Sequence, residues 1–200
     1  MQNETRIPKQ KRAIKKKDKI IDAGWKLITK KGYYNTNTAE IAKKAGVSTG
    51  IVYQYFSDKH DILIEAISKY GDEIFYPMIK LKENNINEKN FSHVVSEMIY
   101  QYIKNHNISK EAHEEIMAMI HSDEKIAQYY YKREVDLTNE LYLLLKDNFS
   151  NKCLLEKIHI MLGMIDNLCH EIVYHKHDGY DYKTMCKIVI DNIYELIKKK

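Results

Sequence analysis

The stretch AEIAKKAGVSTGIVYQYF, from Ala39 to Phe56, decides the fold. It contains two short helical patterns, one on each side of Gly46, and Ser48 is suited to cap the second of them. Two helices this short bury too little surface to be stable alone, so a third helix must pack across both. The stretch therefore predicts a helix-turn-helix domain, in which the second short helix enters a major groove of DNA.

The residues on either side of this stretch supply the packing helices. Residues 1–13 are polar and basic and predict a flexible arm. Apolar residues then recur every three or four positions and predict a helix over about 15–31. Thr38 is expected to cap the first short helix, and a further helix is expected to start near Asp58 or Lys59.

The remainder of the chain also has a helical pattern, which makes the expected fold class all-α with about nine helices. Helices are expected over about 90–105, 110–120, 123–148, 151–176 and 182–198, with Ser109 and Ser122 as N-caps. We expect three parts: a flexible basic arm over 1–13, a helix-turn-helix domain over 14–58, and a ligand-binding and dimerisation domain over 59–200.

The charge is distributed unevenly along the chain. Residues 1–60 hold 14 lysines and arginines against five aspartates and glutamates, whereas the other 140 residues hold 18 against 23. A basic head on an acidic body indicates a polyanionic partner for the head alone. No apolar run reaches the ~20 residues that would span a bilayer, and the three separated cysteines favour reduced thiols. A cytoplasmic location is expected.

The second short helix has an inward and an outward side. Val47, Val52 and Phe56 are expected to point inward. The outward positions are Thr49, Gly50, Tyr53 and Gln54. The amide of Gln54 can pair bidentately with adenine, although solvated surface is the alternative, and packing between helices is the alternative for Tyr53.

The pieces KKGYYNTNTAEIA, AGVSTGIVYQYF and SDKHDIL resemble the DNA-binding domain of the TetR family of bacterial transcriptional repressors, over roughly residues 14–67. The resemblance implies a homodimer that binds a palindromic operator in double-stranded DNA and is released by a small-molecule effector. It also implies contacts to DNA from Thr38, Ser48, Thr49, Tyr53, Tyr55 and Lys59, with Lys59 holding a flanking phosphate.

The body of the chain is rich in tyrosine and methionine, which suits a pocket for an apolar or aromatic molecule, although ordinary core is the alternative. The pocket candidates are Tyr70, Tyr102, Met117 and Tyr130. By the resemblance, the last two helices form a four-helix bundle across a two-fold axis. Its predicted contacts are Leu155, Ile158, Leu162, Ile165, Ile188 and Ile193.

The catalytic and metal-binding patterns that we searched for do not fit. His170 and His175 are five residues apart, not the four of a zinc protease helix, and Glu156-x-x-His159 is a single copy of a di-iron motif. We therefore predict no enzyme, no metal and no cofactor. The alternative to a repressor is a helical binding module for small molecules or proteins, whose basic arm meets a membrane or an acidic partner.

Overall fold

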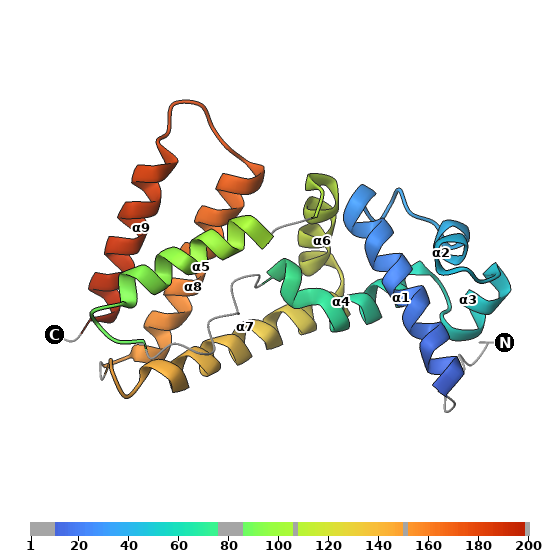
Figure 1. Cartoon of the computed structure of the whole chain (residues 1–200), viewed down its shortest axis with the longest axis horizontal. Coiled ribbons are helices and arrows are strands. Elements are labelled where there is room, and N and C mark those ends of the chain that lie inside the picture. The colour runs from blue at the N-terminus through green and yellow to red at the C-terminus, as the bar shows by residue number, and fades with distance from the viewer. Residues whose placement is uncertain (1–10, 76–85, 106–107, 150–151, 199–200) are drawn as a thin grey trace. The chain divides into compact units, whose positions relative to one another are not determined.

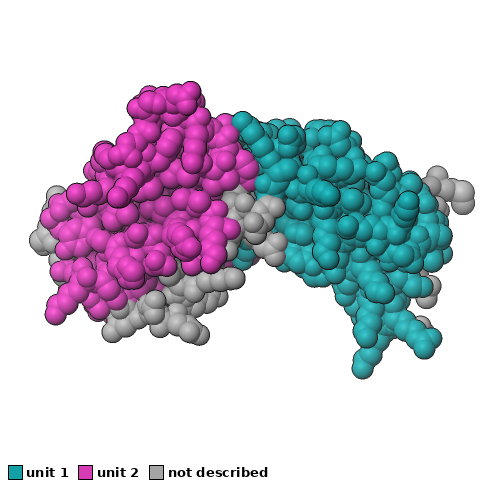
Figure 2. Space-filling view, turned by 45° about the horizontal axis from the view of Figure 1, so that its top comes forward, with its two compact units in different colours: residues 1–74, 107–129 teal, residues 75–106, 130–200 magenta. Residues whose placement is uncertain are grey.

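The computed structural model describes residues 11–75, 86–105, 108–149 and 152–198, and these residues form nine α-helices and no strand (Figure 1). Two compact units divide the chain (Figure 2). Unit 1 comprises Met1–Ile74 and Asn107–Tyr129, and unit 2 comprises Phe75–His106 and Tyr130–Lys200. Neither unit follows the boundary expected at residue 58, because residues 59–74 and 107–129 group with the N-terminal helices.

Unit 1 contains the helix-turn-helix arrangement that the sequence predicts. Its helices are α1 (Lys11–Lys31), α2 (Thr38–Ala45), α3 (Thr49–Tyr55), α4 (Lys59–Phe75) through Ile74, α6 (Lys110–Ser122) and the start of α7 (Glu124–Leu145). Because α1 begins at Lys11, residues 11–13, expected in the flexible arm, are helical. Residues 1–10 of that arm lie outside the described residues.

The core of unit 1 forms where α1 packs against α2 and α3. Ile20, Ile28 and Val52 are fully buried there. At Gly24 a Cβ atom would lie 2.6 Å from Cγ2 of Ile62, so only glycine allows α1 to approach α4 this closely. Burial of this apolar surface stabilises helices that are too short to be stable alone.

Unit 2 contains α5 (Phe91–Asn105), the rest of α7, α8 (Leu154–Tyr174) and α9 (Tyr182–Ile197). Helix α5 packs against both α8 and α9, and α8 packs against α9. The rings of Phe91 and Phe149 meet in its core, with centroids 5.0 Å apart. Within the described ranges, no helix has both the length and the apolar character that crossing a bilayer requires.

Two expected helix caps are corrected by the structure. Asn37, not Thr38, caps α2: its side chain accepts a hydrogen bond from the backbone N–H of Glu40. At α7 the acceptor is Asp123, not Ser122, and it takes hydrogen bonds from the backbone of Lys125 and Ile126. In both cases a carboxylate or amide oxygen next to the predicted hydroxyl provides the cap.

Candidate nucleic-acid interface

The turn between α2 and α3 is fixed by its own backbone and by one serine. Gly46 adopts the left-handed conformation at φ 70°, and its N–H donates to the carbonyls of Ala42 and Lys43. Ser48 then caps α3 as predicted, accepting from the backbone N–H of Ile51 at 3.4 Å. A residue with a Cβ atom would be strained at the glycine, so this turn sets the angle at which α3 leaves α2.

Helix α3 has a buried side and an exposed side. Val52 and Phe56 are buried in the core, whereas Tyr53 is 52% exposed and Gln54 is also exposed. Gly50 and Ser48 are exposed, and Thr49 and Thr38 are half-buried. The structure thus presents the predicted base-reading residues to solvent, and their contact with DNA remains a prediction.

Tyr55, which was predicted to contact DNA, lies on the other side of the helix. It is only 8% exposed and packs in the core of unit 1. Tyr55 follows Val52 by three positions, and residues at this spacing share one face of a helix. Its ring therefore packs behind α3 and not on the exposed side of that helix, and a contact from Tyr55 to DNA stays a prediction.

Lys59, which was predicted to hold a flanking phosphate, instead braces the loop over residues 32–37. Its Nζ donates hydrogen bonds to the carbonyl oxygens of Tyr33 at 2.7 Å and Thr36 at 2.8 Å, and it lies 4.1 Å from the ring centroid of Tyr33. Partial burial lowers the pKa of Lys59. With two of its three N–H groups engaged, this ammonium acts first as a support for the loop.

Glu115 of α6 holds the same loop from another direction, and no local pattern in the sequence indicates this contact. Its Oε2 atom accepts hydrogen bonds from the backbone N–H groups of Tyr33 and, at 3.2 Å, Tyr34. A Cβ atom at Gly32 would lie 2.7 Å from the Oε1 atom of this carboxylate. The loop that leads into α2 is therefore fixed by side chains from both α4 and α6.

A reciprocal capping box ties that loop to α2. The Glu40 carboxylate accepts from the backbone N–H of Asn37 at 3.2 Å, and it pairs with Lys31 Nζ at 2.7 Å. The hydrogen bonds from Lys31 and from Asn37 lower the pKa of Glu40. The Asn-x-x-Glu spacing was a readable signal for this motif, because Asn at an N-cap with Glu three residues later defines the box.

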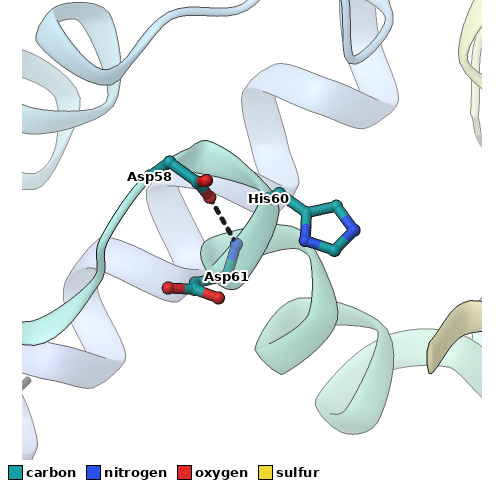
Figure 3. A group of neighbouring side chains, drawn as sticks. All are labelled: Asp58, His60 and Asp61. Atoms are coloured by element: carbon teal, nitrogen blue, oxygen red, sulfur yellow. Dashed lines mark hydrogen bonds between the residues drawn. The ribbon is translucent and has the colours of Figure 1, made fainter. Parts of the chain in front are cut away.

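Asp58, His60 and Asp61 form a group of potential metal ligands within 4.8 Å of one another at the start of α4 (Figure 3). Asp58 accepts from the backbone N–H of Asp61 at 3.0 Å, and Asp61 accepts from that of Ser57 at 2.9 Å. His60 Nε2 lies 2.5 Å from Oδ2 of Asp123. These contacts account for the group as a capped helix start, and we assign no metal to it.

The four predicted pocket residues are divided between the two units: Tyr70 and Met117 belong to unit 1, Tyr102 and Tyr130 to unit 2. Tyr70 is half-buried, donates to Asp22 at 2.6 Å and stacks on Trp25. Tyr102 is fully buried in the core, where its hydroxyl donates to Asp166 at 3.0 Å, and burial raises its pKa. Tyr102 and Tyr70 thus have structural partners, and a role in ligand binding remains a prediction.

The predicted dimer residues also separate into two sets. Ile158, Leu162, Ile165 and Ile193 are buried within unit 2, so the prediction that these side chains face a partner is wrong. Leu155 and Ile188 are exposed as expected. An apolar groove of about 450 Å³ between α8 and α9 is not predicted by the sequence pattern. Its lining includes Ile160, Gly163, Met164, Met185 and Val189.

Comparison with known proteins gives similarity that is strongest around the helix-turn-helix. Residues 20–66 match the family described as "Bacterial regulatory proteins, tetR family". The HTH-type transcriptional regulator HbdR of Aromatoleum sp. (strain CIB) is 51% identical over 57 residues, which cover 28% of this chain and 25% of HbdR. The fatty acid metabolism regulator protein of Bacillus subtilis (strain 168) is 35% identical over 102 residues, which cover 50% of this chain and 52% of that protein. The chain thus spans between a quarter and about half of these two relatives.

Solved structures extend the likeness over most of the chain. FadR from Bacillus halodurans, a fatty acid degradation regulator, is 26% identical with a TM-score of 0.60, and the match covers 90% of this chain and 94% of FadR. A structure from Mesorhizobium loti assigned to the TetR family is 19% identical with a TM-score of 0.69, covering 94% and 97% of the two chains. The second likeness is one of fold.

Proposed function

By its N-terminal domain the chain belongs to the TetR family of bacterial regulatory proteins, and from this premise we propose that it is a DNA-binding transcriptional repressor released from its operator by a small molecule. The observation that carries the proposal is the exposed side of α3. Tyr53 and Gln54 face solvent there, while Val52 and Phe56 hold the helix from behind. Such a helix can enter a major groove without losing its packing.

We propose that the N-terminal part of the chain binds DNA and that the rest binds the effector and dimerises. Residues 14–58, with the basic residues 1–13 before them, would read DNA in the cytoplasm, and residues 59–200 would bind the effector and dimerise. The exposed apolar residues Leu155, Ile160 and Ile188 support a two-fold contact through α8 and α9. A dimer places two α3 helices on half-sites about 34–36 Å apart and explains a palindromic operator.

We propose an effector of apolar or aromatic character. Residues 61–200 hold 12 of the 16 tyrosines, and such rings suit a pocket for molecules of this kind. The names of two relatives concern fatty-acid metabolism or degradation, which favours the apolar class. Release requires only that the effector bind the conformer with low operator affinity better than the conformer that binds DNA. A 100-fold loss of operator affinity corresponds to a coupling free energy of about 2.7 kcal/mol.

The test is to select bound duplexes from a random library with the full chain, and then to measure how variants bind the selected sequence. Tyr53→Ala and Gln54→Ala are each expected to cost about 1–3 kcal/mol, or roughly five- to 150-fold in operator affinity. Tyr131→Ala is the matched control, because this tyrosine of α7 is 51% exposed but lies in unit 2. Failure to recover any common sequence, or equal binding by Tyr53→Ala and Tyr131→Ala, would refute the proposal.

A further inference from the structure

A groove of about 430 Å³ runs between α1 and α2 within unit 1, apart from the exposed face of α3. Two helices contribute to it, and three of its six lining residues are cationic. The groove is lined by Lys19, Asp22, Ala23 and Lys26 of α1 and by Lys44 and Ala45 of α2.

The lining of this lysine groove has a positive net charge, because three lysines stand against the single carboxylate of Asp22. Lys19, Lys26 and Lys44 are exposed, and none of the three makes an ion pair or a hydrogen bond among the described residues. Asp22, the one acidic residue of the lining, is already engaged. Its Oδ1 atom accepts a hydrogen bond from Lys69 Nζ at 2.7 Å. This oxygen is therefore already engaged outside the groove.

Two lysines of unit 1 outside the groove have carboxylate partners at ion-pair distance. Lys17 pairs with Glu65 at 2.6 Å, and Lys31 pairs with Glu40 at 2.7 Å. Lys17 and Lys31 are half-buried and paired, whereas Lys19, Lys26 and Lys44 are exposed and make no ion pair among the described residues. A groove that concentrates uncompensated cations attracts a polyanion.

The position of the groove identifies which polyanion. Ala45 lines it, and the turn at Gly46 leads from there directly to Ser48, the cap of α3. Upstream of Lys19, exposed basic residues continue at helical spacing along α1, at Arg12, Lys15 and Lys16. Exposed positive charge therefore continues from the groove along α1, and the groove is joined to the start of the base-reading helix by the turn at Gly46.

The lining also argues against a protein partner. Protein interfaces have cores enriched in aromatic residues and methionine and depleted of charge. The apolar residues in this lining are Ala23 and Ala45, which offer little surface to a peptide. Phosphate contacts, in contrast, need cations and little else.

We propose that the lysine groove is a second DNA contact, independent of sequence, that holds the phosphates flanking the half-site read by α3. This inference rests on the proposed function. It predicts that the protein covers more DNA than its two half-sites, and that part of its affinity comes from base pairs that it does not read.

The experiment uses the full chain and the sequence recovered by duplex selection. One duplex ends at the outer edges of the half-sites, and the other extends about one helical turn (~10 base pairs) further on each side in arbitrary sequence. The test variant is Lys19→Gln/Lys26→Gln/Lys44→Gln. The control variant, Lys89→Gln/Lys125→Gln/Lys146→Gln, removes the same charge from exposed lysines outside the groove. Dissociation constants are measured over a series of salt concentrations, and thermal melts check that both variants fold.

The wild type and the control are expected to bind the extended duplex more tightly than the short one, with a steeper salt dependence. The groove variant is expected to lose this excess. Its plot of log affinity against log salt concentration should be less steep by about 0.9 for each lost phosphate contact, and its affinity for the extended duplex should fall about tenfold. It is expected to bind the short duplex as the control does. Equal binding of both duplexes by the wild type, retention of the excess by the groove variant, or its loss in the control would overturn the inference while leaving the proposed function intact. If the wild type selects no sequence, the proposed function fails and the inference fails with it.

Discussion

Replacing Glu115 by alanine is expected to loosen the loop that leads into α2. The carboxylate accepts from the backbone N–H groups of Tyr33 and Tyr34, and no other acceptor for these two groups is evident in the described structure. The loop ends at Asn37, which caps α2, and Thr38 follows as the first residue of that helix. Loss of the carboxylate should therefore reach the predicted DNA contacts through the backbone.

The size of the effect follows from the exposure of the two hydrogen bonds. A hydrogen bond to an ionised acceptor contributes about 1.5–3 kcal/mol when buried. The bond from Tyr33 is partly buried and the bond from Tyr34 is exposed, so we expect about 2 kcal/mol for both. That free energy corresponds to roughly a 30-fold loss of hydrogen-exchange protection at these amides, since 1.4 kcal/mol is tenfold.

Hydrogen exchange of the Tyr33 and Tyr34 amides is the direct assay, because it reports the loop alone and needs no two-state unfolding. Operator affinity is measured alongside and is expected to fall. Glu115→Gln, which keeps one acceptor oxygen, should give an intermediate loss, and Glu114→Ala, at an exposed neighbouring position of α6, should give none. Unchanged protection in Glu115→Ala would show that the carboxylate does not hold the loop.

Three further predictions concern stability and assembly. Asp22→Asn should lower the free energy of unfolding by less than about 1 kcal/mol at neutral pH. Burial alone would raise the pKa of Asp22, but the hydrogen bonds from Lys69 and Tyr70 outweigh it and bring this pKa below its ordinary value of 3.8. The stabilisation is therefore present above pH 3.8, and the difference from wild type in urea unfolding should vanish as the pH falls below that value. Ile160→Glu, at a site 53% exposed in the α8/α9 groove, should increase the monomer fraction in sedimentation, whereas Leu143→Glu, 61% exposed on α7, should not. Gly24→Ala should lower the melting temperature by overpacking α1 against α4, whereas Gly163→Ala, where a Cβ atom meets nothing within 4 Å, should leave it equal or raise it.

Signals that act over a few residues were sufficient to predict most helix limits. Gly46 and Ser48 fix the turn between α2 and α3, and Ser109 caps α6 as expected, because each contact lies within four residues along the chain. The errors at Thr38 and Ser122 have one cause. In each case an Asn or Asp stood next to the chosen hydroxyl residue, and sequence alone did not decide which side chain would take the cap.

Contacts between distant residues were beyond such reasoning. Glu115 lies 82 residues from Tyr33, and no local pattern connects them. The roles of Tyr55 and Lys59 were carried over from a resemblance, which transfers a position but not the partners that a side chain meets in this chain. Here the partners are the core for Tyr55 and two loop carbonyls for Lys59.

Helix α8 shows why the dimer residues divided as they did. Its apolar residues cover two sides: Ile158, Leu162 and Ile165 are buried by α5 and α9 within unit 2, while Ile160 is exposed on another side. A helix that is apolar on more than one side has more than one surface to bury, and periodicity alone does not say which of them the same chain covers. The side that the folded unit leaves exposed is the one available to a second copy. Substitutions that test dimerisation therefore belong at Ile160, since a change at Ile158 would disturb the core and the interface together.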